Sequence, residues 1–298
     1  MLENNAPPDQ VIPFPKQATV AYMDGFLQAV RRVRLLENSP IIFDLRATTE
    51  ISPVFVCFIC ALRDLAQERG NSVSLYMPRN KRVASTVRAI KPLFRTVGRP
   101  SLRIADRMLQ VRKITGNNPQ PIEEILELLG DRSGLPIKPE LRFNILLVMT
   151  ELLTNAIDHS GERALYVCAG AWGKSRNLHI TALDFGVGIP QKIRTRYLEY
   201  ADDADAVRAL LQTGGLTTRT DRAGGRGYKT IREVLQANRG RLFLFTGRAK
   251  AILRYDRYEH LFRRARKEFG GTCVDLQFNL DGGALYSNMT GSTHEDIF

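Results

Sequence analysis

The chain has 298 residues, of which 44% are hydrophobic, and 43 Lys and Arg against 31 Asp and Glu give it a formal net charge of +12. This length exceeds the usual size of a single domain, and the sequence shows no repeat or low-complexity tract. Four cysteines fit a reducing compartment, and neither a signal-peptide pattern nor a transmembrane run is present, so we expect a cytoplasmic protein without membrane insertion.

The first hundred residues alternate between strand-like and helix-like segments. Pro40–Leu45 and Ser72–Met77 are short apolar runs typical of strands, whereas Pro53–Arg69 and Arg82–Phe94 show helical patterns. Alternation of this kind predicts a small α/β layer.

Three residues at the first of these helices have two interpretations each. Ser52 before Pro53 is an ordinary helix N-cap pair, which we favour over a phosphoacceptor. Cys57 and Cys60 form a Cys-x-x-Cys, but they lie in an apolar run without a second ligand pair. We therefore expect core packing rather than zinc binding.

Composition also predicts the domain boundaries. The Gly/Asn/Pro cluster at Thr115–Pro121 is typical of a join between domains. We expect a flexible N-terminus at residues 1–15, an α/β domain at 16–116, a second domain at 117–283 and a flexible tail at 284–298.

Positive charge is concentrated before this join. Residues 1–117 contain 18 Lys and Arg against 9 Asp and Glu, including the run Arg31, Arg32 and Arg34. A basic face of this kind can dock a regulatory protein partner, which we favour, or bind nucleic acid. Nucleic acid is the less favoured partner because the sequence lacks a groove-reading motif, and a homodimer is compatible with the sequence.

The second domain contains three motifs that carry chemistry. The first lies on a helix that begins near Pro139, ends before Gly161 and places Glu151, Asn155 and Asp158 on one face. Its other face carries an apolar stripe of Ile145, Val148, Met149, Leu152 and Ala156. A carboxylate beside an amide suits magnesium-assisted phosphate chemistry, since Mg²⁺ prefers oxygen ligands and a carboxylate can orient or deprotonate an attacking hydroxyl.

The second motif follows the strand-like run His179–Leu183. Asp184 would stand at the strand end, where its carboxylate can accept a hydrogen bond from an exocyclic amine such as that of adenine. Gly186 and Gly188 allow the backbone to approach a flat ring closely, and Ile189 follows them.

The third motif is a glycine-rich loop that leads into an amphipathic helix ending near Gly240. Such a loop offers free N–H groups and the positive end of a helix dipole to phosphates. Its residues are Gly224, Gly225, Arg226, Gly227, Tyr228 and Lys229.

In this order and spacing, the three motifs resemble the N, G1 and G2 boxes of the Bergerat-type ATPases, which include gyrase, the histidine kinases and the anti-sigma serine kinases. The resemblance covers about residues 120–282. It implies that Glu151 is the general base, that Asn155 is the magnesium ligand and that Asp184 reads adenine with the support of Thr272. It places the remaining ATP contacts at Asp158, Gly186, Gly188, Ile189, Thr217, Gly224, Gly225, Arg226, Gly227, Tyr228 and Lys229.

The resemblance also implies a fold. Residues 17–110 resemble a divergent STAS domain, the fold of anti-sigma factor antagonists, and the alternative of a phosphoacceptor at Ser52 comes only from this resemblance. The expected α/β architecture is thus a STAS-like domain followed by a Bergerat-type α/β sandwich with a mixed sheet and helices on one face. Residues 191–223 would form a mobile lid over ATP, and the basic stretch 254–267 would form a helical insertion.

We therefore expect a regulatory ATPase that uses ATP and Mg²⁺ and acts by lid closure and partner switching. A protein serine kinase of the anti-sigma type is the first alternative, and a nucleic-acid-associated ATPase is the second. A two-component histidine kinase is disfavoured, because no helix carries the His-Glu phosphoacceptor box.

Overall fold

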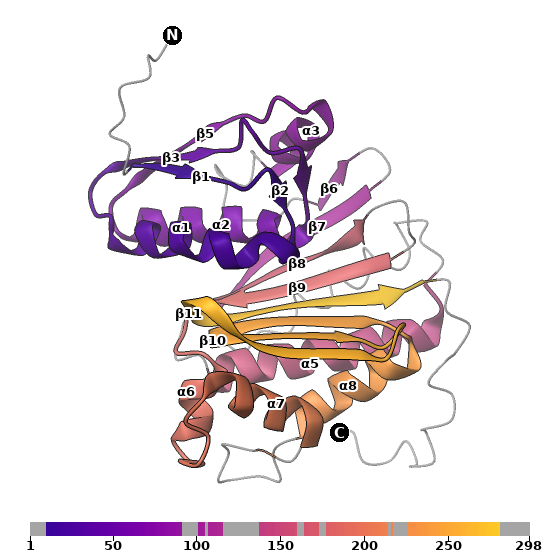
Figure 1. Cartoon of the computed structure of the whole chain (residues 1–298). Coiled ribbons are helices and arrows are strands. Elements are labelled where there is room, and N and C mark those ends of the chain that lie inside the picture. Colours follow the sequence, from indigo (N-terminus) through magenta and orange to yellow (C-terminus); the bar gives the residue numbers. More distant parts are fainter. Residues whose placement is uncertain are drawn as a thin grey trace.

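The computed structural model describes residues 10–90, 101–104, 107–115, 137–159, 164–172, 177–213, 216 and 226–280. In these ranges, sheets and helices stack as alternating layers, with a small parallel sheet at one side and a layer of helices at the other (Figure 1). The α/β class expected from the sequence is confirmed. None of the described helices is long and apolar enough to cross a membrane.

The N-terminal unit is a three-stranded parallel sheet packed on two helices. Its strands run in the order β1 (Val11–Pro13), β3 (Pro40–Asp44) and β5 (Ser72–Tyr76). One face is covered by α1 (Met23–Leu35) and α2 (Pro53–Glu68), as Figure 1 shows. The smaller elements of the unit are β2 (Gln17–Ala18), which pairs with β4 (Glu50–Ile51), the 3-10 turn η1 (Val20–Tyr22), and α3 (Lys81–Ile90).

The centre of the molecule is a six-stranded sheet in the order β10-β11-β9-β8-β7-β6. Its strands are β6 (Ser101–Ile104), β7 (Arg107–Thr115), β8 (Ala164–Trp172), β9 (Asn177–Asp184), β10 (Arg241–Arg254) and β11 (Glu259–Asn279). Every pairing described within this sheet is antiparallel. The prediction of a mixed sheet is therefore wrong for the described strands, which form an antiparallel sheet.

Residues 101–115 lie in this large sheet, although we expected them in the N-terminal domain. β7 pairs along its length with β8, and β6 pairs with β7. The physical reason is that β7 satisfies the backbone groups of β8, which would otherwise form an open sheet edge.

The two faces of the large sheet are covered by different helices. One face carries α5 (Pro139–His159), α6 (Ile189–Arg194), α7 (Asp203–Thr213) and α8 (Arg226–Ala237), while α1 and α2 cover the other (Figure 1). The predicted single helical face therefore holds only for the helices of the second half of the chain.

One hydrophobic core joins the N-terminal unit to the sheet. It runs from α1 and α2 into buried residues of β8, β9, β10 and β11. Phe58 of α2 and Phe269 of β11 illustrate the contact, with ring centroids 5.8 Å apart. The two halves of the chain are thus packed as one body.

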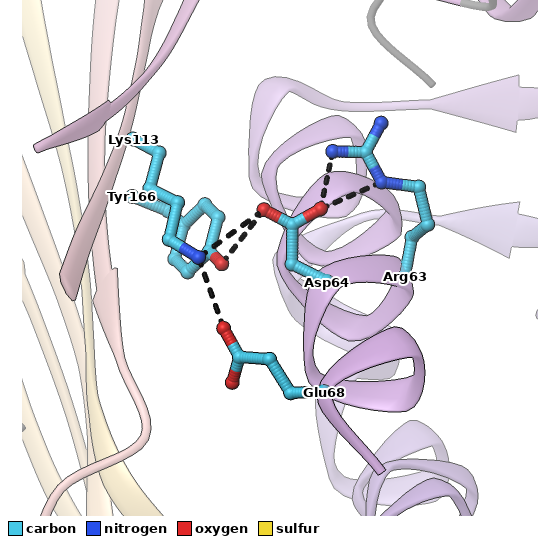
Figure 2. Close-up of polar contacts among 5 residues, drawn as sticks. All are labelled: Arg63, Asp64, Glu68, Lys113 and Tyr166. Carbon is cyan, nitrogen blue, oxygen red and sulfur yellow. Dashed lines mark hydrogen bonds and ion pairs between the residues drawn. The ribbon is translucent and has the colours of Figure 1, made fainter. Parts of the chain in front are cut away.

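Polar contacts at the rim reinforce this junction (Figure 2). The Tyr166 hydroxyl of β8 donates a 2.9 Å hydrogen bond to Asp64 of α2, and Lys113 Nζ of β7 lies 3.0 Å from Glu68 Oε1 and 3.6 Å from Asp64 Oδ2. Arg63 also pairs with Asp64. Because Asp64 is largely buried, these partners stabilise its charge where solvent cannot.

The basic stretch 254–267 is part of a β-hairpin and does not form the expected helical insertion. β10 turns at residues 255–258, where Tyr258 has a φ of +54°, and β11 returns along it. On β11, Ala265 and Phe269 are buried between exposed Arg and Lys side chains. These two side chains can be buried on one face of β11 only when β11 pairs with β10. This burial favours the strand over the helix that we expected from the sequence.

The interpretations of the α2 residues have different outcomes. All four cysteines are free and buried, and burial raises the pKa of each thiol, which confirms core packing for Cys57 and Cys60. Ser52 does occupy the N-cap position before Pro53, but its hydroxyl makes no capping hydrogen bond. Ser52 therefore marks the start of the helix, but its side chain does not cap it.

Candidate functional site

The first motif lies on α5, as predicted. Ile145, Val148, Met149 and Leu152 are buried against the large sheet, and Ala156 packs beside them. This burial fixes the helix and turns Glu151 and Asn155 away from the stripe. The Asn155 Nδ2 atom is buried and has no hydrogen-bond partner among the described residues. An orphaned buried amide is costly, and it marks a place where a polar ligand would satisfy the group.

The third motif brings the start of α8 against these side chains. A Cβ built on Gly227 would lie 2.5 Å from Glu151 Oε2 and 3.2 Å from Asn155 Nδ2. Only glycine fits here without displacing the Glu151 carboxylate. The N-terminus of α8 favours negative charge at this point, from a carboxylate or from a phosphate.

The second motif forms a turn at the end of β9, as expected. Asp184 is buried, and its Oδ1 accepts a 2.8 Å hydrogen bond from the Gly186 amide. Gly188 has a φ of +80°, which favours glycine, and it caps α6, the helix that Ile189 begins. The turn thus fixes the Asp184 carboxylate through its own backbone.

Thr272 lies beside Asp184. The two residues are direct partners in the antiparallel pairing of β11 with β9. Thr272 Oγ1 lies 3.4 Å from Oγ1 of Thr246 on β10. The Thr246 hydroxyl in turn donates to Gly271 O and accepts from the Ile189 amide, both at 2.9 Å.

Tyr228 links the second and third motifs. It is buried in the first turn of α8, and burial together with the nearby Asp184 charge raises the pKa of its hydroxyl. The hydroxyl therefore stays protonated and able to donate at physiological pH. The start of α8 therefore lies against Glu151 at Gly227 and within electrostatic range of Asp184 at Tyr228.

The structure does not show the other predicted site residues at the place where Glu151, Asn155 and Gly227 meet. Lys229 is exposed, and its Nζ lies 3.8 Å from Glu233, one turn along α8. Thr217, Gly224 and Gly225 lie outside the described residues, as do the side chains of Asp158 and Arg226.

The prediction of a mobile lid at residues 191–223 is wrong for residues 191–213. Residues 191–213 include most of α6 and all of α7, and α7 buries Ala206, Val207, Leu210 and Leu211 in the core beneath β10 and β11. A segment that supplies core residues cannot open as a lid without unfolding. Residues 214–215 and 217–225 lie outside the described residues.

Sequence reasoning missed two residues that build the turn. Thr246 on β10 bonds the Gly271 carbonyl of β11 and the Ile189 amide at the start of α6, and Gly271, with a φ of +129°, packs directly against the Asp184 carbonyl oxygen. A polar residue before a glycine in an apolar run was the only local signal for Thr246. The Gly270-Gly271 pair was a stronger signal, since paired glycines in a strand often mark a close backbone approach.

No protein-family model matches the sequence, and no curated protein matches it.

Proposed function

We propose that the chain binds ATP with Mg²⁺ and works as a regulatory ATPase of the histidine-kinase-like superfamily. One observation carries the proposal: Glu151, Asn155 and the start of α8 at Gly227 meet in one place. A carboxylate, a buried amide lacking a partner among the described residues, and a helix N-terminus are together suited to a phosphate chain.

Asp184 would select the base. A buried carboxylate beside Thr272, held by the Gly186 amide, can accept a hydrogen bond from the exocyclic amine of adenine. Guanine presents a carbonyl at the equivalent position, which would face the carboxylate unfavourably. The site therefore favours ATP over GTP.

Asn155 fits the role of a magnesium ligand. Within the described residues, no group of three or more His, Cys, Asp and Glu side chains is arranged to hold a metal ion, so the protein would contribute the Asn155 amide oxygen and the phosphates would supply further oxygens. When bound, the metal would neutralise phosphate charge. Glu151, one helical turn before Asn155, would orient or deprotonate the attacking water or hydroxyl.

Isothermal titration calorimetry tests the proposal. We expect ATP to bind in MgCl₂ and to bind more weakly in EDTA, and we expect slow phosphate release with the same dependence on Mg²⁺. Absence of any ATP binding heat in MgCl₂ would contradict the proposed function.

A further inference from the structure

A residue of the N-terminal unit reaches into the turn that presents Asp184. Arg34, near the end of α1, donates from Nη2 to the Phe185 carbonyl oxygen at 2.9 Å and to the Gly270 carbonyl oxygen at 2.6 Å. Its guanidinium carbon also lies 5.1 Å from the centre of the Phe185 ring. These partners lie 151 and 236 residues further along the chain.

The two carbonyls belong to the two chain segments that carry Asp184 and Thr272, the residues predicted to bind the adenine base. Phe185 directly follows Asp184 on β9, and Gly270 lies two residues before Thr272 on β11. Between them, Gly271 packs on the Asp184 carbonyl oxygen. By binding both segments with one nitrogen, Arg34 fixes the end of β9 relative to β11.

The chemistry of the contact favours arginine. A guanidinium nitrogen carries two N–H groups in a fixed plane, one for each carbonyl, while its flat face can stack on the Phe185 ring. A lysine ammonium has enough N–H donors for both carbonyls, but it lacks the flat guanidinium face that stacks on the Phe185 ring. The Phe185 ring also makes an edge contact with Phe269, with 6.1 Å between the ring centroids.

A second contact of α1 strengthens the connection to β11. Near the start of the helix, Asp24 Oδ2 lies 3.4 Å from Lys250 Nζ, and Asp24 Oδ1 accepts a 3.4 Å hydrogen bond from the Arg266 amide. The helix is thus attached to the hairpin at both ends. A shift of α1 would be transmitted to the turn after Asp184 through Arg34.

We propose that Arg34 is a positioning residue for nucleotide binding, through which the N-terminal unit sets the geometry of Asp184. This inference rests on the proposed function, because it assigns Asp184 to the base. It also bears on the basic run at residues 31–34, where the sequence suggested a docking face: Arg34 is already engaged with Phe185 and Gly270.

The first test needs no nucleotide. Hydrogen–deuterium exchange of the ligand-free full chain should be faster in Arg34→Ala than in wild type, within the peptides that cover residues 184–189 and 269–273. Arg31→Ala, an exposed arginine on the same helix, is the matched control and should exchange like wild type. Unchanged exchange in Arg34→Ala at both segments would overturn the positioning role.

The second test measures ATP affinity. Losing a charged donor that shapes the site should weaken ATP binding by about tenfold in Arg34→Ala, with a smaller loss in Arg34→Lys and none in Arg31→Ala. Added methylguanidinium should restore part of the affinity of Arg34→Ala, which a general folding defect would not allow. Circular dichroism verifies that each variant is folded, and Arg34→Gln replaces Arg34→Ala if that variant is not.

The outcomes separate the two claims. Wild-type protein that binds no ATP would refute the proposed function, and the exchange experiment would still decide whether Arg34 positions the turn. Faster exchange in Arg34→Ala combined with wild-type ATP affinity would overturn the link between Arg34 and nucleotide binding.

Discussion

Gly227 and Glu151 are in such close contact that a single methyl group at residue 227 would displace the carboxylate. The Cβ of an alanine would lie 2.5 Å from Glu151 Oε2, well inside van der Waals contact. Two helices far apart in the sequence thus meet at a glycine and a carboxylate, and this contact brings the first and third motifs together.

Gly227→Ala should therefore lower phosphate release by about tenfold or more, because a small misplacement of a catalytic group has large effects. Gly25→Ala is the matched control: Gly25 also lies in a helix, and a Cβ there would meet nothing within 4 Å. The control should keep full activity and gain about 0.5–1 kcal/mol of stability from its helix propensity. Equal phosphate release by the two variants would contradict the assignment of Glu151 to the catalytic site.

Substitutions at Glu151 and Asn155 should affect ATP turnover and ATP binding differently. Glu151→Ala should retain ATP but lose about 10²–10⁴-fold in turnover, the usual contribution of a positioned base. Asn155→Ala should lose the part of ATP binding that depends on Mg²⁺. Glu140→Ala, exposed on the first turn of α5, is the control and should behave like wild type in phosphate release and calorimetry. Wild-type turnover in Glu151→Ala would refute the base role and leave a nucleotide-binding regulator.

The shared core predicts that both halves of the chain unfold together. Phe269 is buried between Phe58 and Phe185, so Phe269→Ala should destabilise the fold by about 3–5 kcal/mol. Leu198→Ala, at a side chain that is 83% exposed, should change stability by less than about 0.5 kcal/mol. Urea unfolding followed by circular dichroism and by the fluorescence of Trp172 in β8 should give one coincident transition. Two separate transitions would show that the halves fold independently.

How much the sequence could predict depended on how local the signal was. The apolar stripe of α5, the strand before Asp184 and the amphipathic pattern of α8 are all local, and each element forms where it was expected. The first part of β11, which lies in the basic stretch 254–267, could not be predicted in this way, because its stability comes from pairing with β10 and from burying Ala265 and Phe269.

Contacts between distant residues were beyond sequence reasoning for the same reason. Nothing near Arg34 indicates that its partners are Phe185 and Gly270. The pairing of β7 with β8 likewise depends on which sheet offers an open edge. The Gly/Asn/Pro cluster at 115–121, from which we predicted a join between domains, carries no information about that pairing.

Buried thiols predict a loss of stability at alkaline pH. Burial raises the pKa of all four cysteines, to about 12 for Cys60, whereas thiols in an unfolded chain ionise near about pH 8.5. Above that pH the unfolded chain binds fewer protons than the folded one, so stability falls as pH rises towards the folded pKa, by up to about 1.4 kcal/mol per pH unit for each thiol. Urea unfolding at pH 8, 9 and 10 should show the fall, and Cys60→Ala should make it shallower. Stability that rises over this range would contradict the burial of the thiols.

Base selectivity tests the central claim most directly. Calorimetric titration of wild type, Asp184→Asn and the exposed control Asp205→Asn with ATP and with GTP, each in MgCl₂, compares the base-reading carboxylate with a surface carboxylate. We predict that wild type and Asp205→Asn prefer ATP, and that Asp184→Asn binds ATP about ten- to a hundred-fold more weakly, the usual effect of losing a charged hydrogen bond. Equal affinity of wild type for ATP and GTP, or undiminished ATP binding in Asp184→Asn, would contradict the assignment of this site to ATP.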